Sequence, residues 1–288
     1  MNIEGFFAQL DSYFQNQQLD QVEPYLLSSL EQAKEEEDYG AYLSIGNEMI
    51  GYYRSVSRFK EAFDIAEDVL LLLEEMQLES TEHFATTLLN AATAYRAAGN
   101  VRQAYQYYQQ ALQIYTGLLP DNDYRFAGLY NNMSLLLEQM NQNEEALDCL
   151  QKALAIVRKL ENSGAEQAST LTNMALIYFK MEQSTQAGKL LEEALSIFEA
   201  SGKGEETDAH YSAALAGIGE ACFRMGDYPK SLASYEKALA EIKKHFGENL
   251  SYGVLCSNCA TVCRALGEEE KAQDYEKKSK EIQQKLQQ

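Results

Sequence analysis

The chain has 288 residues, of which 45% are apolar and 24% charged, so it can build a substantial core and is neither disordered nor collagen-like. It has 24 basic and 44 acidic residues, a formal charge of −20, which argues against nucleic acid or an anionic membrane as partner. It shows no bilayer-spanning apolar run and no basic leader, and its five cysteines fit a reducing compartment. We therefore expect a cytoplasmic protein.

One pattern recurs along the whole sequence. The segments that start at Asn90, Asn132 and Asn173 align with one another, and a mostly small residue marks the same position of every copy at intervals of 40 to 44 residues: Val22, Ala62, Ala104, Ala146, Ala187, Ser231 and Ala272. Seven copies fill nearly all of the chain, at approximately 3–37, 39–78, 81–118, 123–161, 165–201, 205–245 and 249–286. We therefore expect one domain over residues 1–288.

Each copy predicts two amphipathic helices. The first helices are expected at 1–16, 39–56, 81–98, 123–140, 164–181, 208–225 and 249–266, and a second helix follows each. In the third copy Leu88, Ala91, Ala92 and Tyr95 have the i, i+3, i+4, i+7 spacing of an apolar helix face. No period-2 strand pattern occurs. Since one helix pair cannot bury its own apolar face, the pairs must stack into an all-α solenoid.

The turns between the two helices of a copy carry a second signal. Gly99, Gly226 and Gly267 follow a first helix, where glycine supplies a left-handed C-terminal cap. The second, fourth and fifth copies depart from this pattern, since they have Ser57, Asn141 and Glu182 at the corresponding positions.

The residues at equivalent positions of the copies resemble the pattern of a known family. The series Ala92, Tyr95, Gly99, Ala104, Tyr108 and Ala111 is similar to the tetratricopeptide repeat, and the unit of about 42 residues resembles the long variant found in kinesin light chain. Peptide-responsive bacterial regulators carry related repeats. The resemblance implies a right-handed superhelical α-solenoid of seven antiparallel helix pairs, whose first helices line a concave groove. It also implies binding of extended peptides or partner helices rather than catalysis.

The charge is divided unevenly between the two helix types. The seven predicted first helices contain nine acidic and six basic residues, so most of the −20 lies on second helices and loops. If the second helices form the outer wall, this acidity is mainly a solvated surface that keeps the protein soluble.

Asparagine recurs at one position of the repeat, five residues before the position that Tyr95 occupies in the third copy (the Tyr95 column). It stands at Asn90, Asn132 (beside Asn131), Asn173 and Asn258, whereas Glu48 and Gly217 interrupt the series. Asparagine is a middling helix former, and its amide matches the C=O and N–H groups of an extended peptide. Neighbouring columns contribute the cations Arg54, Arg96, Lys180, Arg224 and Arg264. One hypothesis is a peptide-binding groove of these residues. The other is that the asparagines bridge adjacent helices and serve the stacking.

The sequence gives little support for a catalytic or metal-binding site. The spacing Cys256-x-x-Cys259-x-x-x-Cys263 invites a metal site, but all three cysteines fall on an apolar helix stripe and favour core packing. No phosphate-binding glycine loop occurs. We expect no enzyme activity, no metal and no cofactor.

The favoured function is a scaffold that binds a protein or peptide in its groove. One alternative is a peptide-sensing regulator that acts on a separate effector chain. The other is a structural module that assembles through its end repeats, with the oligomeric state open. Glu276 and Ser279, expected to face water at the C-terminal end, argue against the last.

Overall fold

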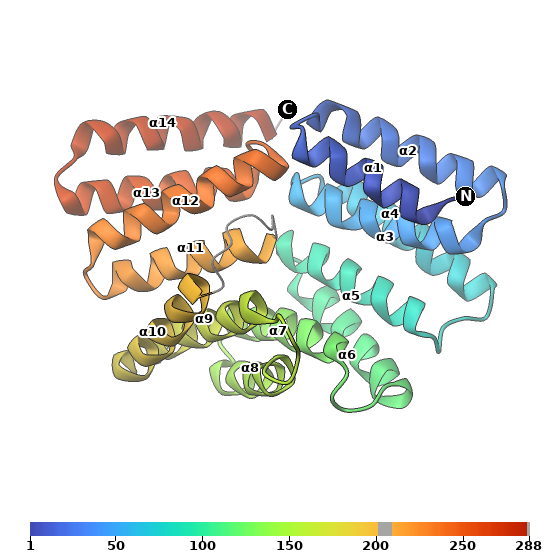
Figure 1. Ribbon diagram of the computed structural model, residues 1–288, viewed down its shortest axis with the longest axis horizontal. Helices are drawn as coiled ribbons and strands as arrows, with labels where there is room; N and C mark the ends of the chain where they lie inside the picture. Colours follow the sequence, from blue (N-terminus) through green and yellow to red (C-terminus); the bar gives the residue numbers. More distant parts are fainter. Residues whose placement is uncertain (201–208, 287–288) are drawn as a thin grey trace. The chain divides into compact units, whose positions relative to one another are not determined.

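The computed structural model describes residues 1–200 and 209–286 of the chain (Figure 1). These residues contain fourteen α-helices and no β-strand, which confirms the all-α prediction. The first helices of the pairs are α1 (Ile3–Gln15), α3 (Tyr39–Ser55), α5 (Glu82–Ala97), α7 (Tyr124–Gln139), α9 (Gly164–Lys180), α11 (Ala209–Arg224) and α13 (Leu250–Leu266). The second helices are α2 (Leu19–Glu35), α4 (Phe59–Glu75), α6 (Val101–Leu118), α8 (Asn143–Val157), α10 (Ser184–Ala200), α12 (Tyr228–Phe246) and α14 (Glu269–Leu286). None of the described helices is apolar over enough residues to cross a membrane.

The chain divides into two compact units, and each has the same internal plan. One unit comprises residues 1–120 with 244–247, and the other comprises 121–243 with 248–288. In the first unit α1, α3 and α5 pack against α2, α4 and α6, and α3 also contacts α5 (Figure 1). In the second, α7, α9 and α13 pack against α8, α10 and α14, and α9 contacts both α7 and α11. Helix pairs therefore stack, and neighbouring first helices touch.

The turn after each first helix has one geometry in all seven pairs. One or two residues past the helix end, the backbone has a positive φ of 80–82° at Gly99, Gly226 and Gly267. Non-glycine residues take the same left-handed conformation at Gln17, Ser57, Asn141 and Glu182, with φ of 57–64°. In each pair the next N–H donates to the carbonyl of the Tyr95 column, for example Asn100 to Tyr95 at 2.8 Å and Gln142 to Leu137 at 2.9 Å. This bond caps the helix end and keeps the turn even where the glycine is missing.

The predicted small-residue columns form the core. Every member of the repeating marker column, from Val22 to Ala272, is 0% exposed. Ser231, the polar member, donates its hydroxyl to the Gly219 carbonyl at 2.7 Å. Small side chains at these crossings let paired helices approach closely, while the fully buried Tyr108 and Tyr235 rings fill the space beside them.

The expectation that Glu276 and Ser279 form a water-facing cap is wrong. Ser279 is 5% exposed, and its carbonyl lies beneath Gly253 of α13. Glu276 is half-buried and pairs with Arg264 of α13 at 2.5 Å. Both residues lie on the side of α14 that faces the first helix of the same pair. Tyr108 and Ala111, which are buried, occupy the equivalent positions in the third pair.

Candidate ligand-binding site

The asparagines of the first unit connect neighbouring first helices. Asn47 of α3 donates its amide Nδ2 to Thr87 Oγ1 of α5 at 3.0 Å and also to the Leu43 carbonyl of its own helix at 2.9 Å. In return Asn90 of α5 donates its Nδ2 to Asn47 Oδ1 at 2.8 Å. The Asn47 amide therefore exchanges two hydrogen bonds with the next repeat.

The second unit repeats this arrangement one position earlier than the sequence suggests. Asn131 of α7 donates its Nδ2 to Thr170 Oγ1 of α9 at 3.0 Å, and Asn173 of α9 donates to Asn131 Oδ1 at 3.5 Å. Asn132, by contrast, donates within its own helix, to the Gly128 carbonyl at 3.0 Å. Asn258 is half-buried on α13. These contacts are the ones that the stacking hypothesis predicts for Asn90 and Asn173.

Sequence reasoning missed Asn47 as the central residue of the first set. A sequence pattern could have identified it: in both sets a threonine, Thr87 or Thr170, stands three residues before the second asparagine, Asn90 or Asn173. The asparagine series is interrupted by glycine at position 217, and this also has a structural reason. A Cβ there would lie 2.4 Å from Thr172 Cγ2 of α9, so any larger side chain would collide with the neighbouring first helix.

Three of the five expected groove cations are neutralised by carboxylates of the second unit. Lys180 Nζ lies 2.8 Å from Glu138 Oε1, Arg224 Nε lies 2.7 Å from Glu220 Oε1, and Arg264 pairs with Glu276 as described above. These cations already have an internal partner, so a ligand would have to compete for them.

Arg54 and Arg96 differ from these three. They occupy the same position on the consecutive first helices α3 and α5, and the Arg96 charge acts on Arg54. No carboxylate of the described residues lies within ion-pair distance of either. Burial lowers the pKa of the Arg54 guanidinium, and the Arg96 charge lowers it further.

The surroundings of this arginine pair are polar but contribute no negative charge. The Arg96 charge acts on the buried Tyr108 side chain, whose hydroxyl lies 3.0 Å from Thr93 Oγ1. The Arg96 Nε is buried and has no hydrogen-bond partner among the described residues. Two neighbouring like charges, both half-buried, are a cost to the folded state that an anionic ligand would relieve.

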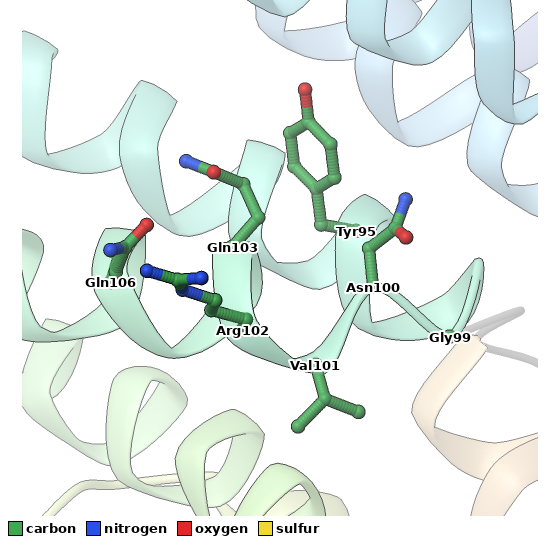
Figure 2. A pocket seen from close by; sticks show the side chains of 7 residues that line it. All are labelled: Tyr95, Gly99, Asn100, Val101, Arg102, Gln103 and Gln106. Carbon is green, nitrogen blue, oxygen red and sulfur yellow. The ribbon is translucent and has the colours of Figure 1, made fainter.

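Two other features are weaker candidates. A shallow depression lies where α5 turns into α6, lined by Tyr95, Asn100, Arg102, Gln103 and Gln106 (Figure 2). The Tyr95 ring already packs within the protein, since it stacks on Phe63 with ring centroids 4.0 Å apart.

Cys256, Cys259 and Cys263 are buried in the apolar cluster around α13, and burial raises the pKa of the Cys256 thiol to about 11. A buried protonated thiol is a packing group rather than a nucleophile.

Comparison with known proteins identifies the repeats. Residues 83–159, 124–200 and 210–285 match the family model described as tetratricopeptide repeat. Two curated relatives from Arabidopsis thaliana, KINESIN LIGHT CHAIN-RELATED 3 and KINESIN LIGHT CHAIN-RELATED 2, are 27% identical over 220 residues and 25% identical over 230 residues. The alignments cover 75% and 78% of this chain but 33% and 34% of the relatives, so the chain spans about a third of their length.

Solved structures share the fold at low sequence identity. A Rap protein complexed with competence and sporulation factor has a TM-score of 0.66 and 15% identity, over 99% of this chain and 77% of that one. BtubC (BKLC) from P. vanneervenii has a TM-score of 0.52 and 19% identity, over 82% and 92% of the two chains. Because the family matches cover more than half of the sequence and the helices stack in pairs, this chain belongs to the tetratricopeptide repeat family, with repeats of the kinesin light chain type.

Proposed function

We propose that this protein-interaction scaffold holds an extended peptide or a partner segment along its first helices and anchors it at Arg54 and Arg96. The observation that carries the proposal is the absence of any carboxylate partner for these two arginines within the described residues, while Lys180, Arg224 and Arg264 each have one. Guanidinium groups bind carboxylates through two parallel hydrogen bonds. The anchored group is therefore an acidic side chain or a C-terminal carboxylate of the ligand.

Proteins of similar fold support this kind of ligand. The Rap protein named above was solved with competence and sporulation factor, and NprR was solved with its cognate peptide NprX. NprR has a TM-score of 0.60 and 17% identity, over 88% of this chain and 71% of that one. The asparagines are secondary in our proposal, since Asn90 and Asn173 are engaged between helices. The net acidic charge argues against nucleic acid or an anionic membrane as the partner.

Selection from a random peptide library tests the anchor. The purified chain should enrich sequences that contain Asp, Glu or a free C-terminus. Arg96→Met should weaken binding of the enriched peptides by about tenfold or more, since a charged hydrogen bond of about 1.5–3 kcal/mol is lost. Methionine keeps a flexible stem and is a good helix former, so the fold should survive. Arg158→Met, at the exposed C-terminal end of α8, is the matched control. Unchanged peptide binding by Arg96→Met would contradict the proposal.

The hydrogen bonds between first helices favour a second candidate function, a peptide-responsive regulator. Asn47 and Asn131 each tie one repeat to the next through a threonine and an asparagine. A ligand that competes for these amides would loosen the stacking and change the shape offered to a separate effector. Slower hydrogen exchange in α3 and α5 on peptide binding would favour a static scaffold, and faster exchange would favour the regulator.

A further inference from the structure

Three methionines stand at one position of the repeat in the second unit, and we call them the methionine row. Met140, Met181 and Met225 each directly follow a first helix, at the ends of α7, α9 and α11. Met140 is 39% exposed, Met225 is 48% exposed and Met181 is half-buried. The fold does not require an apolar residue here, because Asn16 and Ala98 occupy the equivalent positions of the first unit.

The three helix ends that carry the row lie next to one another. Lys180, beside Met181, donates its Nζ to the Glu138 backbone carbonyl at 2.8 Å and so joins the ends of α9 and α7. Phe179 of α9 and Cys222 of α11 belong to one buried apolar cluster, and these two helices contact each other. Since the axes of packed helices are about 8–10 Å apart, the methionine row follows the edge of the stacked first helices in steps of about 9 Å.

The charges beside the methionine row are unbalanced. Within four residues after each methionine, the charged side chains are the exposed Glu144, Glu182 and Asp227, and none of them forms an ion pair among the described residues. On the preceding side the two cations, Lys180 and Arg224, are already neutralised by carboxylates, as described above. The edge therefore presents exposed apolar side chains bordered by three carboxylates that have no cation.

We infer that the methionine row docks an amphipathic helix of a partner protein, whose apolar side chains contact the methionines and whose basic side chains meet the bordering carboxylates. The acidic border favours a basic partner, and it disfavours a second copy of this chain, whose own charge is −20. Residues seven apart on a helix lie on one face about 10.5 Å apart, close to the step of the row. An extended segment instead turns successive side chains to opposite faces. The flexible thioether of methionine adapts well to such a partner surface.

Fluorescence anisotropy on the full chain tests the inference with three labelled peptides. The basic helical peptide consists of leucine and lysine, with leucine along one helix face. The second peptide has the same composition in scrambled order, and the third is the helical peptide with glutamate in place of lysine. We expect the basic helical peptide to bind at least about tenfold more tightly than either of the others. Equal binding of the basic helical and scrambled peptides, or tighter binding of the acidic one, would overturn the inference.

Variants of the edge locate the contact. The triple variant combines Met140→Gln, Met181→Gln and Met225→Gln. It should weaken binding of the basic helical peptide by about tenfold, because glutamine keeps the length of the side chain and loses the apolar contact. Glu182→Lys alone should weaken binding several-fold. The matched controls are Met76→Gln and Glu75→Lys at the exposed end of α4, and both should leave binding unchanged. Thermal unfolding followed by circular dichroism checks that every variant is folded.

The outcomes also separate this inference from the proposed function, which concerns the first unit. Arg96→Met should leave binding of the basic helical peptide unchanged, and the triple variant should leave binding of the library-selected acidic peptides unchanged. Binding of the basic helical peptide that survives both the triple variant and Glu182→Lys would overturn the inference. Sedimentation of the parent chain as a dimer and of the triple variant as a monomer would also overturn it, because the row would then be covered by a second copy.

Discussion

Replacing Asn47 with alanine measures how much the amide bridge contributes to the stacking of α3 on α5. The change removes two hydrogen bonds between the helices, the 3.0 Å bond to Thr87 and the 2.8 Å bond from Asn90. At roughly 0.5–1.5 kcal/mol each, they sum to about 1–3 kcal/mol. Alanine is a better helix former than asparagine, which stabilises the helix by about 0.5 kcal/mol. We therefore expect a net loss of about 0.5–2.5 kcal/mol in the free energy of unfolding.

Asn132→Ala is the matched control, because its amide bonds only to the Gly128 carbonyl of its own helix among the described residues. Its expected effect on stability is close to zero. Urea unfolding followed by far-UV circular dichroism gives both values. A double-mutant cycle with Thr87→Ala should show a coupling of about 0.5–1.5 kcal/mol with Asn47→Ala. Equal losses for Asn47→Ala and Asn132→Ala, or zero coupling to Thr87, would refute the bridging role.

Three further predictions concern turns, charge and packing. Asn141→Gly and Glu182→Gly should each stabilise the chain by roughly 0.5–1 kcal/mol in urea unfolding, because both positions have a left-handed φ of 60° that favours glycine; a loss of stability would contradict the turn assignment. Glu48→Gln should raise the unfolding temperature at pH 7 but not near pH 4: burial and Asp11 raise the folded-state pKa, so the carboxyl destabilises the fold increasingly as pH rises above its unfolded-state pKa. An equal gain at both values would point to another cause. Gly217→Ala should cost about 1–3 kcal/mol by overpacking against the Thr172 methyl at 2.4 Å, and Thr172→Ser, which removes that methyl, should restore most of it; an additive double mutant would exclude this contact.

The repeat, most helix ends and the positions that form the core could be predicted from the sequence of this protein alone. The third first helix was expected at 81–98 and is Glu82–Ala97, and the seventh was expected at 249–266 and is Leu250–Leu266. These features follow from periodicity and local chemistry, since apolar spacing, small residues at crossings and a left-handed cap are each read from neighbouring residues. The turn at Asn141 shows that the fold keeps the same cap without glycine, because the bond to the Leu137 carbonyl is made by the backbone.

Which polar residues already have a partner could not be predicted from the sequence and depends on the packing of the helices. Lys180 and Arg54 are both cations on first helices, yet Lys180 forms an ion pair with Glu138, 42 residues away, whereas Arg54 has no carboxylate partner among the described residues and is affected by the Arg96 charge. Likewise Asn131 bridges two helices while the adjacent Asn132 bonds within its own. One residue along a helix rotates a side chain by about 100°, so a single step decides whether it meets the next repeat or solvent. That choice depends on how closely neighbouring first helices approach each other, which is a property of the stacked pairs and not of any one repeat.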